Sequence, residues 1–338
     1  MDSVIITGLL AYGMSGKVFH APFLEAHPGF KLHAITERNQ KKAQQDYPSL
    51  ISYNSVDELL DDPAIDLVVI NTPNFSHVDY AKRALLKGKH ILVEKPFAAT
   101  VAEATELFDL ARSLGKQVFV FQNRRWDSDF NSVKKVIDQQ SLGKLNEVHF
   151  RYDRYRNEIG PKTFKEEPMP ASGLLYDLGP HLLDQVISVF GKPLSYHKIL
   201  GKNRKNTQVD DYFSIHLSYA DSVNVFVHAN MLVTDIQPAF VLHGTNGSLI
   251  KDRTDIQEAQ LLKGMKPTDP AYALEEPGME AVLTLIDDQG NKKQSTIAAD
   301  KGKYPELFEA VHASLTQGKA YPVTEEQILW QLEILESK

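Results

Sequence analysis

Short apolar runs recur along the first third of the chain, separated by stretches in which apolar and polar positions follow a helical period. Runs without polar interruptions are typical of strands that are buried on both faces of a sheet. The five apolar segments are residues 4–10, 32–35, 67–70, 90–93 and 118–121, and the run at 67–70 is continuous. The clearest helix is expected over 100–115, where Thr100 and Glu103 form a capping box. Alternating strands and helices predict a doubly wound parallel sheet.

The pattern changes after residue 123. Later segments alternate apolar and polar positions with a period of two, as strands with one buried face do. They are residues 145–155, 212–219, 223–228 and 240–243. Because no crossover helices separate most of them, they predict a largely antiparallel sheet in an α+β domain. We therefore expect two domains, 1–123 and 124–338. A bare face on the second sheet would favour a homodimer or homotetramer.

One helix, expected within 173–191, carries polar residues opposite its apolar side. Asp177, His181, Asp184 and Gln185 cluster there, and Asp177 and His181 are about one turn apart. Proline is tolerated best in the first turn of a helix. Pro180 therefore predicts that the polar group lies at a helix beginning, near a cleft if the two domains face one another.

A glycine-containing turn, residues 11–16, stands between the first strand and a helix expected over 17–27. Such a turn can hold a pyrophosphate at the helix N-terminus, as in the dinucleotide-binding domains of the Rossmann type. Ala11 occupies the usual position of the first glycine, which alanine can fill if its φ stays negative. The next strand ends at Thr36, Glu37 and Arg38. Glu37 would bind the ribose hydroxyls of NAD and Arg38 would meet the 2′-phosphate of NADP, so the choice stays open. The alternative is a solvated charged pair.

Chemistry-bearing residues follow the carboxyl ends of the predicted strands, where parallel sheets bind ligands. They are Gly13, Glu37, Thr72, Lys95 and Asn123. Lysine and histidine can exchange a proton with a hydroxyl near neutral pH.

Each candidate also has a plain structural interpretation. Lys95 could belong to a surface Glu-Lys pair, and Asp177 and His181 could be a helix cap and a core histidine. A metal site at Asp177, His181 and Asp184 is not expected, because the ligand count does not fit catalytic zinc. We interpret the other histidines as structural residues without partners. They are His20, His149, His216, His228, His243 and His312.

The composition and the charge argue against several classes of function. A formal net charge of −7 argues against a nucleic-acid partner, despite the basic and aromatic run at 151–156. No apolar run reaches the roughly 18 residues of a membrane span. The first residues show no signal peptide, so a cytoplasmic location is expected. The absence of cysteine excludes thiol chemistry.

With these motifs in view, the chain resembles the Gfo/Idh/MocA oxidoreductase family along nearly its whole length. The resemblance rests on residues 11–16, 72–74, 94–96, 123–127 and 176–181. Within the family it is most similar to scyllo-inositol dehydrogenase-like members, through residues 17–22, 124–127 and 154–156.

The resemblance implies hydride transfer between a nicotinamide and a secondary hydroxyl or ketone of a cyclic polyol or sugar. A base must then take the hydroxyl proton, and we assign this role to His181, oriented by Asp177. Lys95 would stabilise alkoxide charge or act as the base itself. Arg125, Tyr155 and Arg156 would position substrate hydroxyls.

For the NAD(P)(H) cofactor we expect a larger set of contacts. It comprises Ala11, Tyr12, Gly13, Met14, Gly16, Thr36, Glu37, Arg38, Thr72, Pro73, Asn74, His77, Glu94 and Asn123. Two rival functions are a cofactor-binding sensor or co-regulator without turnover, and a nicotinamide-dependent glycosidase or dehydratase.

Overall fold

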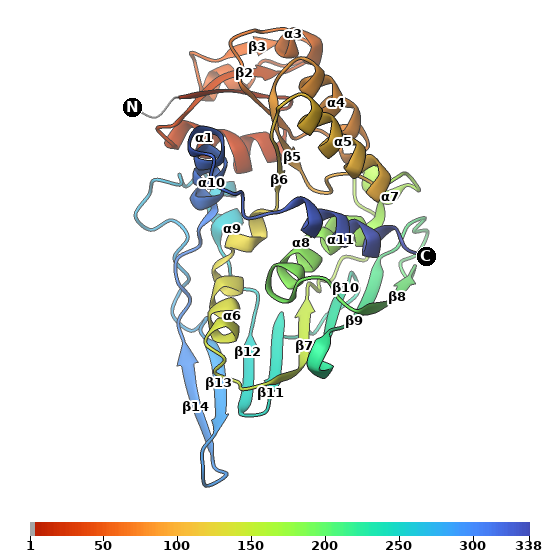
Figure 1. Ribbon diagram of the computed structural model, residues 1–338, viewed down its shortest axis with the longest axis vertical. Helices are drawn as coiled ribbons and strands as arrows, with labels where there is room; N and C mark the ends of the chain where they lie inside the picture. The colour runs from red at the N-terminus through yellow and green to blue at the C-terminus, as the bar shows by residue number, and fades with distance from the viewer. Residues whose placement is uncertain (1–3) are drawn as a thin grey trace. The chain divides into compact units, whose positions relative to one another are not determined.

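The computed structural model describes residues 4–338 and divides into two compact units (Figure 1). The first unit contains the described part of Met1–Asn123 together with Gln257–Tyr272 and Tyr304–Leu329. The second contains Arg124–Ile256, Ala273–Lys303 and Trp330–Lys338. The two later segments of the first unit pack onto its early helices. For example, Phe308 stacks on Phe23 with ring centroids 5.1 Å apart.

The first unit confirms the predicted doubly wound sheet. Its six strands are all parallel, in the order β3-β2-β1-β4-β5-β6. The strands are β1 (Ile5–Leu9), β2 (Phe30–Thr36), β3 (Ile51–Tyr53), β4 (Leu67–Ile70), β5 (His90–Glu94) and β6 (Val118–Phe121). Every residue of β4 is buried, as its continuous apolar run predicts. The strand order reverses at β1 and β4, and such a switch point is where open α/β sheets bind ligands.

The helices of this unit follow the apolar periodicity. They are α1 (Ala21–Ala26), α2 (Ala43–Asp46), α3 (Val56–Leu60), α4 (His77–Leu86), α5 (Val101–Ser113), α9 (Gln257–Leu262) and α10 (Tyr304–Gln317). The capping box of α5 is present as predicted. The expected helix over 17–27 is instead a π-helical turn, η1 (Gly16–His20), followed by α1. The pattern changes there because Ala21 donates to the Gly16 carbonyl and Pro22 has no N–H to donate.

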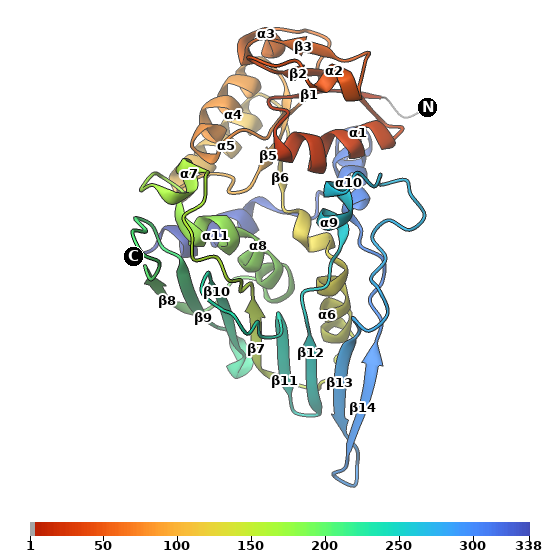
Figure 2. The same cartoon turned by 180° about the vertical axis from the view of Figure 1, so that it is seen from behind.

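The second unit contains the predicted, mostly antiparallel sheet. Its eight strands run in the order β14-β13-β12-β11-β7-β10-β9-β8, and only β7 and β10 pair in parallel. They are β7 (Leu145–Arg151), β8 (Ser195–Gly201), β9 (Tyr212–Ser218), β10 (Asn224–Asn230), β11 (Phe240–Gly244), β12 (Gly247–Lys251), β13 (Ala281–Ile286) and β14 (Lys292–Ile297). The β13–β14 hairpin forms one edge (Figure 2). The sequence pattern misses β8 and β14 because most of their side chains are exposed.

Two helices cover one face of this sheet: α6 (Ser128–Asp138) packs on β12, and α8 (Gly173–Phe190) packs on β7, β9 and β10. The side chains of β9 and β10 that point to the opposite face are only half-buried.

The placement of Pro180 at a helix beginning is wrong. Helix α8 starts after Ser172, so Pro180 and His181 lie in its interior. An interior proline costs roughly 3 kcal/mol, and burial of the surrounding helix offsets this cost. Leu182, Leu183 and Val186 are fully buried. In addition, Gln331 on α11 (Glu325–Glu336) donates to the Pro180 carbonyl at 2.8 Å.

Throughout residues 4–338, none of the helices combines the length and the apolar content that a bilayer span requires.

Candidate functional site

A cavity of about 690 Å³ lies where β1, β2 and β4 end in the first unit. Small-molecule sites typically have volumes of about 300–1,000 Å³. The cavity is lined by many of the residues that the sequence assigns to the cofactor. These are Ala11, Tyr12, Thr36, Glu37, Arg38, Thr72 and Pro73. Further lining residues include Lys42, Asn54, Tyr80 and Arg83, which the sequence analysis does not single out.

The glycine turn is held by Asn71, a residue that the sequence analysis passes over. Its side chain accepts from the Ala11 N–H at 3.0 Å and donates to the Ala11 carbonyl at 2.8 Å. Ala11 does not adopt a positive φ, so alanine fits this turn. Gly16 is required, because a Cβ there would lie 2.2 Å from the Ala11 carbonyl oxygen. A Cβ at Gly13 would meet nothing within 4 Å, so the backbone there is open to a ligand.

Tyr12 ties the turn to α2. Its hydroxyl donates to Asp46 at 2.7 Å, and Lys17 donates to the same carboxylate oxygen at 2.8 Å. Burial and the bond to Asp46 raise the pKa of Tyr12, which therefore stays a hydrogen-bond donor. The bond from Lys17 lowers the pKa of Asp46. Met14, by contrast, is 48% exposed on the turn.

The carboxylate of Glu37 is engaged by the start of α2 and by β3. It accepts from the backbone N–H groups of Lys42 and Ala43 at 2.8 and 3.1 Å, and from the Ser52 hydroxyl at 2.9 Å. The side chain is buried, whereas Arg38 is exposed at the cavity. At this strand end the carboxylate stabilises the loop and the guanidinium faces the open space.

His77 ties the loop after β4 to the loop after β5. It is only 1% exposed, and its two ring nitrogens lie 2.8 Å from the carbonyl oxygens of Thr72 and Pro96. Burial lowers the pKa of His77. The Lys95–Pro96 peptide bond is cis, and Asn74 starts the short helix η2 (Asn74–Ser76). His77 thus supports both loops from behind.

The expectation that His20 lacks a partner is wrong. Its Nε2 lies 2.9 Å from Glu94 Oε1, and the Ser15 hydroxyl donates to the same oxygen at 2.5 Å. His149, His216 and His243 also have polar partners, at 2.6, 2.8 and 2.7 Å. The partner of His149 is Glu147 on the same strand, whereas His216 and His243 bond to Asn224 and Ser248 on neighbouring strands.

Asn123 is buried at the start of η3 (Asn123–Trp126). Two residues on, in the second unit, Arg125 makes two 2.7 Å bonds to the carboxylate of Asp184 on α8. Both side chains are nearly inaccessible. Burial raises the pKa of Asp184, and the guanidinium opposes that change. The pair fixes the segment after Asn123 to the helix that carries Asp177 and His181.

Asp177 and His181 lie one turn apart on α8. Asp177 accepts from Lys165 Nζ at 2.5 Å and from Arg154 Nη2 at 3.5 Å, so two cations of the same unit hold its negative charge. His181 is 7% exposed. Lys165 lies on the short helix α7 (Thr163–Glu166), twelve residues before Asp177, and no local pattern distinguishes it from a surface lysine.

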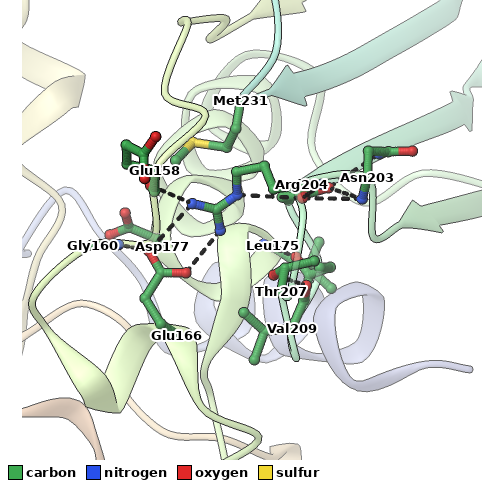
Figure 3. A network of polar contacts seen from close by, with 12 residues as sticks. Glu158, Gly160, Glu166, Leu175, Asp177, Asn203, Arg204, Thr207, Val209 and Met231 are labelled. Atoms are coloured by element: carbon green, nitrogen blue, oxygen red, sulfur yellow. Dashed lines mark hydrogen bonds and ion pairs between the residues drawn. The ribbon is translucent and has the colours of Figure 1, made fainter.

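The segment carrying Lys165 is anchored by a buried arginine (Figure 3). Arg204 donates to Glu166 at 2.8 Å, to the Glu158 carbonyl at 3.2 Å and to Asp211 at 3.3 Å. Only 2% of its side chain is exposed. Before this segment, Tyr155 and Arg156 are exposed, and their backbone pairs with Leu232 and Met231. They are therefore accessible to a ligand.

Among the described residues, His27, Glu309 and His312 of the first unit could approach a common metal ion. The Gly29 N–H donates to His27 Nδ1 at 3.0 Å, so the neutral ring carries its proton on Nε2, which faces Glu309 at 2.9 Å. That nitrogen is a donor in this arrangement and has no lone pair for a metal.

Similarity to known proteins extends along nearly the whole chain. Residues 4–122 match the model of an oxidoreductase family with an NAD-binding Rossmann fold, and residues 134–337 match the C-terminal alpha/beta domain of the same family. The uncharacterized oxidoreductase YdgJ of Escherichia coli is 36% identical over 99% of this chain and 96% of its own. The scyllo-inositol 2-dehydrogenase (NADP(+)) IolW of Bacillus subtilis is 33% identical over 98% of this chain and 92% of its own.

A solved oxidoreductase from Bacillus cereus superposes with a TM-score of 0.91 at 32% identity, covering 98% of this chain and 95% of that one. The cavity, the glycine turn and the strand order fit the dinucleotide that the family model describes. The chain therefore belongs to the Gfo/Idh/MocA family and is an NAD(P)-binding oxidoreductase.

Proposed function

We propose that the protein interconverts a secondary hydroxyl and a ketone on an inositol-like cyclic polyol or a sugar. The full-length similarity to a scyllo-inositol 2-dehydrogenase carries this proposal. Lys95, Asp177 and His181 support it, because oxidation of an alcohol needs a group that takes the hydroxyl proton. A sensor without turnover has no need of such groups.

When bound, the nicotinamide cofactor supplies the hydride acceptor for oxidation or the hydride donor for reduction. His181 takes the proton of the substrate hydroxyl during oxidation. Asp177, which accepts hydrogen bonds from Lys165 and Arg154, orients the imidazole and increases its proton affinity. Lys95 hydrogen-bonds the substrate oxygen and stabilises its developing negative charge. Tyr155 and Arg156 are exposed and bind the remaining hydroxyls.

The preferred cofactor in this proposal is NADP(H). Discrimination against a 2′-phosphate usually requires a free carboxylate after the second strand, and Glu37 has committed its oxygens to Lys42, Ala43 and Ser52. Arg38 and Lys42 both line the cavity and supply positive charge for a phosphate. The other predicted contacts, from the turn at 11–16 to Thr72, Pro73 and Asn74, hold the rest of the dinucleotide.

We also propose a homodimer or homotetramer that buries the outer face of the eight-stranded sheet. On this face His149, Phe226 and His216 stack with ring centroids 4.9 and 4.7 Å apart. Half-buried aromatic rings on a broad sheet face are suited to contact with a second copy.

A substrate panel tests the activity. Inositols, aldoses and sugar phosphates are offered with NADP and with NAD, and absorbance of the reduced nicotinamide is followed for the wild type, Lys95→Ala and Lys87→Ala. Lys87 is exposed and pairs with Asp61, so it controls for loss of a lysine charge. We expect reduction with a polyol by the wild type and the control only.

The rival functions give different results in the same panel. Binding of NADP by calorimetry without reduction on any substrate would favour a sensor. With a glycoside added to the panel, its hydrolysis, or loss of water from a sugar, without accumulation of NADPH would favour the glycosidase or dehydratase.

A further inference from the structure

Asn71 directly follows β4 and joins it to the turn that follows β1. The backbone ladder between these strands continues to a bond from the Leu10 N–H to the Val69 carbonyl at 3.1 Å. One residue further along, the Asn71 side chain accepts from the Ala11 N–H at 3.0 Å and donates to the Ala11 carbonyl at 2.8 Å. A side-chain amide carries the same donor and acceptor as a peptide group. It therefore bonds both backbone groups of Ala11 where the turn leaves the sheet.

The same amide lies beside the other end of the turn. A Cβ on Gly16 would be 2.2 Å from the Ala11 carbonyl oxygen and 2.8 Å from Asn71 Nδ2. The first and last residues of the turn are thus packed together next to one side chain, and Asn71 is only 7% exposed. Gly13, between them, has open space where its side chain would be. Asn71 therefore fixes the ends of the turn and leaves its middle accessible.

The place of these bonds in the sheet gives them a functional meaning. β1 and β4 are the neighbours at which the strand order reverses. At such a point the connections leave on opposite faces of the sheet, and a ligand binds in the crevice between them. A turn that had to find its shape during binding would lose conformational entropy at that step, whereas a turn fixed in advance would not.

We propose that Asn71 is a positioning residue for the dinucleotide: its amide holds the turn at 11–16 in one shape before the cofactor binds, and so increases the affinity for every cofactor that contains a pyrophosphate. Asn71 acts through the backbone of Ala11. The inference rests on the binding of NAD(P) and is independent of which substrate is oxidised.

Calorimetry of cofactor binding tests the proposal without turnover. Asn71→Ala removes both bonds to Ala11 and should raise the dissociation constants of NAD and NADP by the same factor, about 10- to 100-fold. Adenosine 2′-monophosphate contains the 2′-phosphate and no pyrophosphate, so it should bind the variant as tightly as the wild type. A general loss of structure would weaken all three ligands alike.

Lys89→Met is the matched control for the loss of a buried polar side chain. Lys89 lies in the same unit and is 6% exposed, and it donates to the carbonyls of Asp62 and Ile65 at 2.7 and 2.9 Å. These bonds are at the amino ends of β4 and β5, whereas the turn follows the carboxyl end of β1. Lys89→Met should lower the thermal stability and leave the three dissociation constants unchanged.

Hydrogen exchange of the cofactor-free wild type needs no variant. The Ala11 amide should exchange slowly, because Asn71 Oδ1 accepts from it, and NADP should add little protection. Fast exchange of this amide, with protection only after NADP binds, would overturn the proposal. Unchanged affinities in a folded Asn71→Ala would overturn it as well, and so would an equal loss for adenosine 2′-monophosphate.

Steady-state kinetics separates this inference from the proposed function. Asn71→Ala should raise the KM values of NAD and NADP by the same factor and leave kcat at saturating cofactor unchanged. A wild type that binds both cofactors, loses affinity in Asn71→Ala and oxidises no polyol would reject the proposed function and retain the role of Asn71. Polyol oxidation with wild-type KM values for both cofactors in Asn71→Ala would do the reverse.

Discussion

Two glutamates stand at equivalent places in the parallel sheet, Glu37 after β2 and Glu94 at the end of β5, and they differ in their donors. Glu37 receives two backbone N–H groups from the start of α2 and the Ser52 hydroxyl from β3. Glu94 receives donors from the glycine turn and η1 and directly precedes Lys95. The first anion is solvated by local dipoles and stabilises a loop, whereas the second links two functional segments. The donors, and not the residue type, decide the role of a strand-end acid.

The largest expected effect tests the lysine beside Glu94. Lys95→Met should lower kcat/KM for polyol oxidation by about 100- to 10,000-fold, because a positioned charged group stabilises developing charge on the substrate oxygen. Steady-state kinetics with the best substrate of the panel measures this loss. Lys87→Met is the matched control and should differ from the wild type by less than twofold. A Lys95→Met enzyme of normal activity would remove the residue from the site.

The second-largest expected effect concerns Arg38, the residue after Glu37. Arg38→Ala should raise the KM for NADP about 10- to 100-fold and leave the KM for NAD nearly unchanged, since hydrogen bonds to a charged group contribute about 1.5–3 kcal/mol. Cofactor titrations at saturating substrate measure both constants. The control is Arg112→Ala on α5, which removes an exposed ion pair with Glu325 of α11. Equal losses for the two cofactors would show that Arg38 does not read the 2′-phosphate.

Substitution of Glu37 itself should act on stability. Glu37→Gln keeps the shape of the side chain and weakens three charge-assisted hydrogen bonds, so we expect the free energy of unfolding to fall by about 1.5–3 kcal/mol. Urea denaturation gives this value, and the exposed Glu25→Gln should stay within about 0.5 kcal/mol of the wild type. Unchanged stability with a raised KM for NAD would instead make Glu37 a ribose ligand.

The smallest effect is the pH dependence contributed by Glu94. Its pKa is lowered in the folded protein, so its contribution to stability is present above the unfolded value of about 4.3 and is lost as the pH falls through the folded value. This pH-dependent part amounts to about 1.4 kcal/mol for each unit by which the pKa is lowered. Urea denaturation between about pH 3 and 7 should show wild type and Glu94→Gln converging at the acid end. Parallel curves would mean that the pKa of Glu94 is the same in the folded and unfolded states.

The sequence predicted the sheet of the first unit because apolar runs such as Leu67–Ile70 leave few alternatives to a buried strand. It also located the turn at 11–16 and the strand ends that line the cavity. The start of α8 was predicted too late in the chain, because the preference of proline for the first helical turn was applied to Pro180. That rule does not include the burial that stabilises α8 around this residue. Asn71 and Lys165 could not be assigned, because their partners Ala11 and Asp177 are 60 and 12 residues away. Donor geometry of this kind arises only from the folded chain.

The Arg204 network has a consequence for protein engineering. Loop 156–172 carries Lys165, and its anchor Glu166 is bonded to an arginine of another segment. A loop transplanted alone from a relative would leave that guanidinium buried opposite the wrong residues. To transfer substrate preference from a relative, the loop at 156–172 and the segment at 203–211 that contacts it therefore have to be replaced together.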